Sequence, residues 1–195
     1  MMGRQLECNV YAVTADNKNC ILIDCSYPDL YDRCIRYGLT PRAVLLTHGH
    51  LDHILGCPQM QKKGAEIYCG EGEDKFIFSE GNKSIFGVKL PEFTVDKTLK
   101  DGEEIELYGL KIKVIATPGH TVGGVTYLIG DCLFTGDTLF QGSVGRCDFP
   151  TGDQKTLINS VKKLYALDGN YTVYSGHGWD TTLDYERKNN MFVRQ

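Results

Sequence analysis

Residues 47–53 read Thr-His-Gly-His-Leu-Asp-His. This stretch begins where the apolar run Ala43–Thr47 ends, and that run has the length and composition of a buried strand. Four potential metal ligands, His48, His50, Asp52 and His53, therefore follow directly from a strand end. Imidazole and carboxylate groups gathered this closely indicate a metal centre.

The same local pattern occurs four times along the chain: an apolar strand, then Ser or Thr, a glycine-containing turn and a potential ligand. The four instances are Leu45–His50, Ile115–His120, Leu133–Asp137 and Val173–His177. All five histidines of the protein lie in or beside these turns. Because α/β architectures place their sites at the ends of strands, we expect the ligands to meet at one rim of the sheets.

The complete candidate set is too large for one tetrahedral ion. Its members are His48, His50, Asp52, His53, His120, Asp137 and His177. Two divalent metal ions per chain are therefore expected. Nitrogen-rich ligation with carboxylate suits zinc, iron or manganese, with zinc as the first expectation. The set holds no thiolate, which argues against a purely structural zinc site.

The rest of the chain predicts an α/β protein with mixed sheets, because short β-rich runs alternate with helix-length segments. The predicted strands are Asn9–Val13, Ile21–Cys25, Ala43–Thr47, Glu66–Cys69, Glu104–Leu107, Leu110–Ala116, Gly124–Ile129, Cys132–Thr135 and Tyr171–Tyr174. The predicted helices are Pro28–Tyr37, Gly56–Lys63, Gln154–Leu167 and Thr182–Asn190. Tyr108-Gly109 separates two alternating runs, which indicates an antiparallel hairpin.

The stretch from Glu71 to Lys100 is the least periodic part of the chain. Its aromatic residues are scattered among charges and glycines. One interpretation is a long excursion over the surface that acts as a lid. The alternative is a loop whose aromatic side chains pack on the core.

Length and composition predict a single domain over residues 1–195, soluble and cytoplasmic. Met1–Thr14 lacks the apolar stretch of a signal peptide, and no segment approaches the ~20 apolar residues that span a bilayer. The net charge of −4 and the absence of a basic run argue against a nucleic-acid partner. The eight cysteines contain no Cys-x-x-Cys pair, so we expect reduced, mostly buried thiols rather than disulfides or metal ligands.

The motif at residues 47–53, followed by His120, Asp137 and His177, resembles the metallo-β-lactamase superfamily. Thr117–Thr121, Phe134–Phe140 and Gly142–Pro150 resemble its glyoxalase II-like branch, also called the hydroxyacylglutathione hydrolase-like branch. The tail from Gly176 resembles the small single-domain members. The fold that this resemblance implies is an αββα sandwich, two mixed sheets flanked by helices.

The resemblance also implies an assignment of the ligands. His48, His50 and His120 would hold one metal, Asp52, His53 and His177 the other, and Asp137 would bridge them. Two such ions share a hydroxide that attacks the substrate, and Asp52 would orient it as the catalytic residue. The implied activity is hydrolysis of S-acylglutathione-type thioesters such as S-D-lactoylglutathione. Because no histidine is left to protonate a leaving group, a thioester is favoured over an amide.

Several alternatives stay open from the sequence. The chain ends 18 residues after His177, without the helical region that helps larger glyoxalase II enzymes bind glutathione, so another thiol carrier, an ester or a lactone is an alternative substrate. A persulfide dioxygenase-like oxidoreductase with one iron would share several motifs. Arg146 is a candidate for binding a substrate carboxylate, or else it forms an ion pair with Asp148 or Asp153. The sequence does not indicate an oligomeric state.

Overall fold

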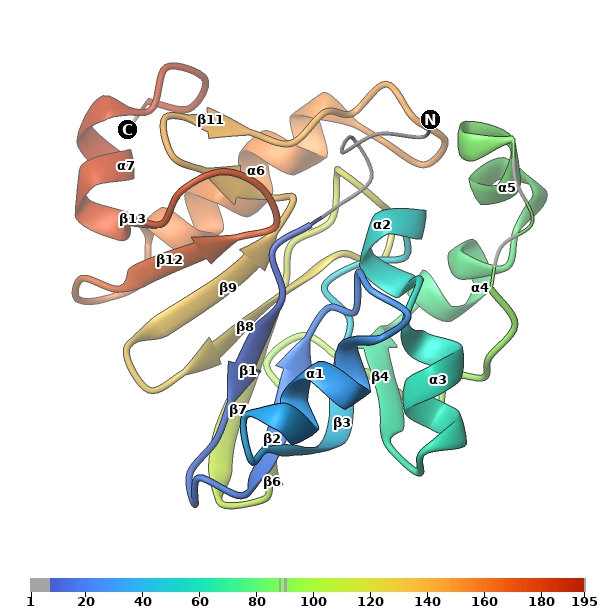
Figure 1. Ribbon diagram of the computed structural model, residues 1–195. Coiled ribbons are helices and arrows are strands. Elements are labelled where there is room, and N and C mark those ends of the chain that lie inside the picture. The colour runs from blue at the N-terminus through green and yellow to red at the C-terminus, as the bar shows by residue number, and fades with distance from the viewer. Residues whose placement is uncertain (1–7, 88, 90, 195) are drawn as a thin grey trace.

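Two mixed β-sheets face each other at the centre of the molecule, and helices cover the outer face of each (Figure 1). This computed structural model describes residues 8–87, 89 and 91–194. Residues 1–7, which are half of the Met1–Thr14 stretch, lie outside the described residues, as do 88, 90 and 195. The arrangement is the αββα sandwich that the resemblance implied.

The first sheet has five strands in sequence order. They are β1 (Tyr11–Val13), β2 (Asn19–Ile23), β3 (Thr40–Leu45), β4 (Glu66–Gly70) and β5 (Lys97–Leu99). The β1–β2 pair is antiparallel, whereas β2, β3, β4 and β5 run parallel to one another. The parallel strands are rich in buried Ile, Leu and Val, as expected for a sheet covered on both faces.

The second sheet has six strands in the order β13-β12-β9-β8-β7-β6. In chain order they are β6 (Glu104–Leu107), β7 (Leu110–Ala116), β8 (Val125–Ile129), β9 (Cys132–Gly136), β12 (Thr172–Ser175) and β13 (Thr181–Thr182). Only the β9–β12 pair is parallel. A two-stranded ribbon, β10 (Leu139–Phe140) with β11 (Ser143–Val144), follows β9.

Seven helices are found among the described residues. They are α1 (Leu30–Arg36), α2 (Leu51–Ile54), α3 (Cys57–Lys62), α4 (Glu73–Ile77), α5 (Glu80–Phe86), α6 (Gln154–Tyr165) and α7 (Leu183–Asn189). None of them is long and apolar enough to cross a bilayer. The four predicted helices correspond to α1, α3, α6 and α7, each slightly shorter than predicted.

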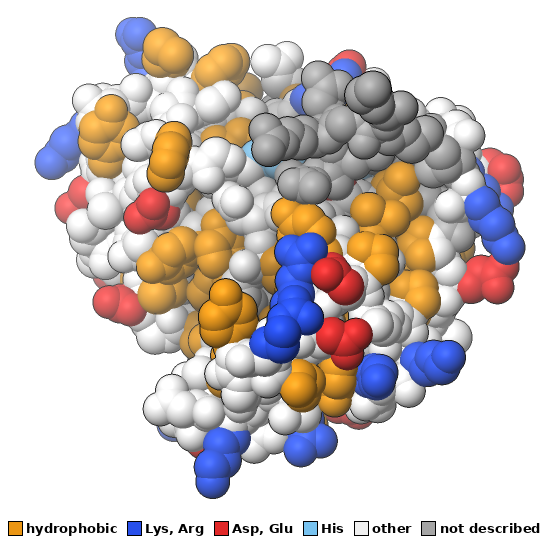
Figure 2. All heavy atoms as spheres, viewed as in Figure 1, with side chains coloured by type: hydrophobic (Ala, Val, Ile, Leu, Met, Phe, Trp, Pro, Cys, Tyr) orange, Lys and Arg blue, Asp and Glu red, His pale blue; other side chains and the backbone are white. Residues whose placement is uncertain are grey.

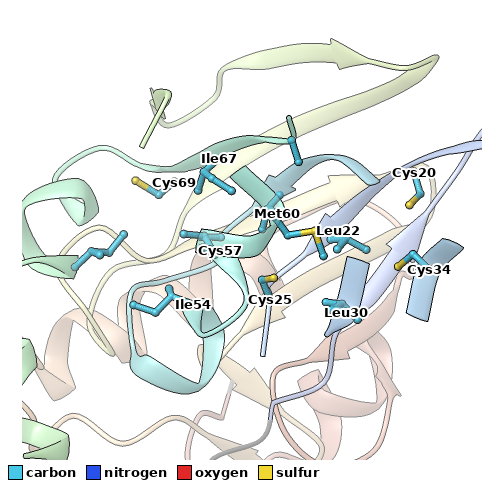
Figure 3. Close-up of a cluster of buried hydrophobic side chains, with 14 residues drawn as sticks. Cys20, Leu22, Cys25, Leu30, Cys34, Ile54, Cys57, Met60, Ile67 and Cys69 are labelled. Atoms are coloured by element: carbon cyan, nitrogen blue, oxygen red, sulfur yellow. The ribbon is translucent and has the colours of Figure 1, made fainter. Parts of the chain in front are cut away.

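Side chains on β2 show how the layers are built, because alternate residues of a strand point to opposite faces. Cys20 and Leu22 pack in a buried cluster with Leu30 of α1 and Met60 of α3, on the outer side of the sheet (Figure 3). Ile21 and Ile23 instead join Val114, Tyr127 and Phe134 of the second sheet in the space between the sheets. A third cluster joins the other face of the second sheet to α6 and α7.

The predicted hairpin at residues 104–116 is confirmed as the antiparallel β6–β7 pair. Tyr108 and Gly109 both have positive φ, 50° and 81°, which matches the right-handed twist of a tight two-residue turn. The cysteine prediction also agrees with the structure. All eight are free, six are buried, and five of these lie in the cluster of Figure 3.

Residues 71–100 contain regular secondary structure that neither interpretation of this segment predicted. The segment forms α4, α5 and β5, and the side chains of Glu73 and Asn82 are fully buried. Two of its aromatic residues do pack inward: Phe76 is 4% exposed and Phe93 packs against the Figure 3 cluster. The side chain of Phe86 lies outside what is described. Helices of five and seven residues are too short for periodicity to reveal.

Candidate metal centre

The four strand ends singled out in the sequence deliver their side chains to one place. His48 and His50 follow β3, and Asp52 and His53 lie on the single turn α2 that comes next. His120 follows β7, Asp137 follows β9 and His177 follows β12. One strand of the first sheet and three of the second thus supply all seven candidates, at a rim where the two sheets meet.

Three histidines form the first half of the centre. One ring nitrogen from each of His48, His50 and His120 lies within 4.8 Å of the others. His120 Nε2 lies 2.9 Å from His50 Nδ1. All three residues are buried, with 2–4% exposure. Three converging imidazole nitrogens are a typical ligand set for one transition-metal ion.

The second half combines two histidines with a carboxylate. Asp52, His53 and His177 bring one ligand atom each to within 4.8 Å of one another. Asp52 Oδ2 lies 3.2 Å from His177 Nε2 and 3.7 Å from His53 Nε2. Asp137 touches both halves, because its Oδ1 is 3.5 Å from His53 Nε2 and its Oδ2 is 3.6 Å from His120 Nε2. It therefore lies where a bridging ligand would lie.

The donor atoms fit metal ions for a second reason. Within the described part of the chain, His48 Nε2, His53 Nε2 and Asp137 Oδ1 are buried and have no hydrogen-bond partner. A buried polar atom without a partner costs roughly 1–3 kcal/mol. Three such atoms aimed into one cluster are explained if each coordinates a metal ion.

Hydrogen bonds on the far side of the rings orient these donors. Asp24 Oδ2 accepts from His53 Nδ1 at 2.8 Å and from Thr47 Oγ1 at 2.8 Å. Thr47 Oγ1 in turn lies 3.1 Å from His48 Nδ1 and can accept its proton. His120 Nδ1 lies 2.7 Å from the backbone oxygen of Arg146, which can only accept. These partners leave Nε2 of His48, His53 and His120 as the atom that faces the cluster.

The two halves differ in their electrostatics. Burial lowers the pKa of His50 to about 3, and burial likewise lowers the pKa values of His48 and His120, so these rings are neutral at pH 7. Hydrogen bonds to Asp137 and Asp52 instead raise the pKa of His177 to about 9. The second half, with Asp52, His53, His177 and the shared Asp137, is called the carboxylate-rich half below. Without metal it holds protons that a bound cation would have to displace.

The centre opens to solvent beside His177. Its side chain is 37% exposed, whereas that of Asp52 is 12% exposed and that of His53 is fully buried. On the face in Figure 2, histidine reaches the surface at one small place. Phe140 lies beside His177, and Phe149 beside His50, with ring centroids 6.2 and 5.6 Å apart.

Arg146 lies next to this rim, and the structure selects between its two alternative partners. Its Nε and Nη2 atoms bind both carboxylate oxygens of Asp148, at 2.7 and 2.6 Å. The guanidinium also lies over the Phe149 ring, 3.8 Å from its centroid. Asp153 is engaged elsewhere, where its side chain caps α6. Arg146 is thus held in an ion pair at the edge of the site.

Sequence reasoning missed Asp24 as a member of the site. This residue directly follows β2 and has a positive φ of 61°, but no Ser or Thr and no glycine turn precede it, so it does not match the strand-end pattern. Cys8 was also missed, and its thiol lies close to Asp24 and His53. Burial raises the pKa of the Cys8 thiol to about 11, so without a metal the thiol is protonated at pH 7.

The comparison with known protein families agrees with this geometry. The sequence model of the metallo-beta-lactamase superfamily matches residues 3–177, a range that includes all seven candidates. The chain belongs to the metallo-beta-lactamase superfamily. Among curated relatives of this superfamily member is hydroxyacylglutathione hydrolase GloC of Haemophilus influenzae, which is 35% identical over 195 aligned positions. The match covers 95% of this chain and 92% of the relative.

Solved structures show the same relationship. The BLEG-1 B3 metallo-beta-lactamase superposes with a TM-score of 0.90 and 30% identity, over 98% of this chain and 97% of that protein. TTHA1623 in a di-iron-bound form superposes with a TM-score of 0.84 and 33% identity, over 99% of this chain and 98% of that protein. The superfamily fold therefore extends over nearly the whole chain.

Proposed function

We propose that this superfamily member is a binuclear metal-dependent hydrolase that cleaves thioesters of the S-acylglutathione type, such as S-D-lactoylglutathione. The observation that carries the proposal is Asp137, whose two carboxylate oxygens lie within 3.6 Å of histidine nitrogens from both halves of the centre. A single carboxylate placed in this way serves two ions better than one. The 35% identity to a hydroxyacylglutathione hydrolase supports the choice of substrate class.

The proposed assignment divides the seven ligands between two sites. His48, His50 and His120 hold one ion, Asp52, His53 and His177 hold the other, and Asp137 belongs to both. Zinc is the first expectation and iron the second, since a di-iron form is known for TTHA1623. Divalent ions in such a site lower the pKa of water to about 7 and so supply a nucleophile at neutral pH.

The chain's own residues account for the remaining steps. Burial opposes ionisation of Asp52, but its hydrogen bond to His177 and the charge of His53 hold its pKa below the ordinary value, so it is a carboxylate at pH 7. That carboxylate can accept a hydrogen bond from the attacking water and orient it. All five histidines face the cluster, so none serves as a general acid. A departing thiolate, with a thiol pKa near 8.5, needs little protonation.

The rim accounts for substrate binding. Phe140 and Phe149 offer apolar surface beside the opening, and we propose that Arg146 binds a carboxylate of the thiol carrier. To do so, the guanidinium would have to exchange the Asp148 carboxylate for that of the substrate. Because Arg146→Ala removes this contact, it should raise KM for glutathione thioesters more than for thioesters of a neutral thiol. An equal change for both substrates would assign Arg146 a structural role in its ion pair.

The test combines metal content with product analysis on one preparation. We expect about two ions per chain, release of free thiol from S-D-lactoylglutathione and no oxygen uptake. One iron per chain with oxygen uptake on glutathione persulfide would instead identify an oxidoreductase. Faster turnover of a lactone, a simple ester or a β-lactam would support the assignment as a hydrolase but contradict the choice of a thioester as substrate.

A substitution tests the role of Asp52 directly. Asp52→Asn removes the charge that orients the water and keeps the size of the side chain, so we expect kcat for thioester hydrolysis to fall by roughly 100-fold or more. Asp168→Asn makes the same chemical change at an exposed residue and is the matched control. Thioester turnover at the wild-type rate in Asp52→Asn would contradict the mechanism.

A further inference from the structure

Glu73, in the first turn of α4, is a fully buried carboxylate outside the ligand set. Its Oε1 accepts from the backbone N–H of Gly49 at 2.7 Å. Its Oε2 accepts from the backbone N–H of Gly123 at 2.7 Å and from Thr121 Oγ1 at 3.0 Å. Gly49 separates His48 from His50, and Thr121 follows His120. One carboxylate thus joins the two loops that carry the three-histidine half.

The neighbouring helix completes the contact with the first loop. Asn82 of α5 is also fully buried, and its amide nitrogen donates to the backbone oxygen of Gly49 at 2.8 Å and to that of Ile77 at 3.0 Å. Both backbone polar groups of Gly49 are therefore bound by α4 and α5. A peptide held at its N–H and its C=O cannot rotate without breaking buried hydrogen bonds.

Packing at the two loops leaves no space for adjustment. A Cβ at Gly49 would overlap the Ile77 side chain and come within 3.1 Å of Glu73 Oε1. A Cβ at Gly123 would overlap the backbone nitrogen of Glu73 and lie 2.8 Å from its Cβ. The backbones of both loops therefore lie directly against α4, at the residue whose side chain binds them.

The carboxylate-rich half of the centre is held by other groups. His53 is oriented by Asp24, and Asp137 and His177 follow β9 and β12. Among the contacts that the structure gives for Glu73, none involves Asp52, His53 or His177. Glu73 therefore contacts only the loops of the three-histidine half, whereas Asp24 supports His53 directly and His48 through Thr47.

We propose that Glu73 is a positioning residue for one of the two metal ions, the one held by His48, His50 and His120, and that Asn82 assists it through Gly49. This inference rests on the two-ion function proposed above. Glu73 does not touch the reacting atoms. It fixes the spacing between the His48–His50 loop and the His120 loop, and so sets the geometry and the affinity of that half.

The decisive variant is Glu73→Gln, because all three partners of the carboxylate are donors. Whichever way the amide is turned, its NH₂ group faces a donor, and one loop loses its acceptor. We expect the affinity for one ion to fall at least about tenfold and that for the other to change less than about twofold. Competition with a chromophoric chelator measures both affinities, and the absorption spectrum of the cobalt(II)-loaded protein reports the changed coordination. Glu71→Gln, at an exposed position on the same segment, is the matched control.

Thr121→Val is the second variant, in case Glu73→Gln does not fold. It removes one of the three hydrogen bonds at nearly constant volume, so the same ion should bind more weakly, by a smaller factor. Wild-type protein that binds fewer than two ions would reject the proposed function itself. Two ions in the wild type with unchanged affinities in both variants, or an equal loss at both sites, would overturn the role of Glu73.

Discussion

Gly176, between β12 and His177, shows how little space surrounds the shared carboxylate. A Cβ at this position would overlap Asp137 Oδ1 and lie 2.9 Å from His53 Cε1. We expect Gly176→Ala to displace the Asp137 carboxylate, lower the metal content below two ions per chain and reduce thioester turnover by roughly 100-fold or more. Metal analysis of the purified variant, with a parallel assay of thiol release, checks this prediction.

Gly178 is the matched control, because it tests backbone conformation without filling the site. Its φ is 80°, and a Cβ there would meet nothing within 4 Å. Gly178→Ala should therefore cost about 1 kcal/mol of folding free energy, from left-handed backbone strain, and leave the metal content unchanged. Full metal occupancy in Gly176→Ala would show that Asp137 can move aside.

At the scale of elements, α7 is joined to the end of α6 by Arg187. Its guanidinium donates to the backbone oxygen of Tyr165, the last residue of α6, and to those of Leu167 and Gly169 in the loop that follows. It also pairs with Asp184. We expect Arg187→Ala to lower the free energy of unfolding by about 2 kcal/mol, because two part-buried carbonyls and one exposed carbonyl lose a charged donor. Urea denaturation measures the change.

Lys188→Ala removes a neighbouring exposed cation and should change the stability by less than about 0.5 kcal/mol. Equal stability of the Arg187 and Lys188 variants would contradict this role for Arg187. Comparing the Arg187 and Lys188 variants also distinguishes an effect on folding from an effect on catalysis. The contacts of Arg187 are with α6, α7 and the loop after α6 rather than with the metal ligands.

For the whole molecule, the raised pKa values in the carboxylate-rich half predict how the stability of the metal-free protein depends on pH. The pKa of His177 is raised to about 9 by Asp137 and Asp52, above the ordinary value of 6.5. The folded chain therefore binds more protons than the unfolded chain between these values, and stability present below pH 6.5 is lost as the pH rises through 9. The pKa of His53 is shifted in the same direction.

Urea denaturation at pH 7 and pH 9.5, with chelator and with excess metal, checks this prediction. We expect the urea midpoint of the chelated protein to be lower at pH 9.5 than at pH 7. The midpoint of the metal-loaded protein should fall less, because the ion takes the place of the protons between the same carboxylates and imidazoles. An identical pH response with and without metal would contradict the assignment of His177.

Local patterns in the sequence predicted nine of the strands, the β6–β7 turn and the convergence of the seven candidate residues. They did not predict β5, β10, β11 and β13, which are only two or three residues long. The strands and the turn could be predicted because alternation and a left-handed turn at Tyr108-Gly109 are properties of neighbouring residues. The convergence could be predicted because residues that follow strand ends share one rim of the sheets. The segment at 71–100 has no such local signature. Its short helices are stabilised by burial against the rest of the molecule, and their sequence alone does not specify them.

Only the tertiary structure decided which groups support the ligands. Glu73 meets Gly49 and Gly123 across 24 and 50 residues of chain, and Asp24 meets His53 across 29. The donors that make a buried carboxylate stable come from distant segments, so nothing adjacent to Glu73 in sequence marks it.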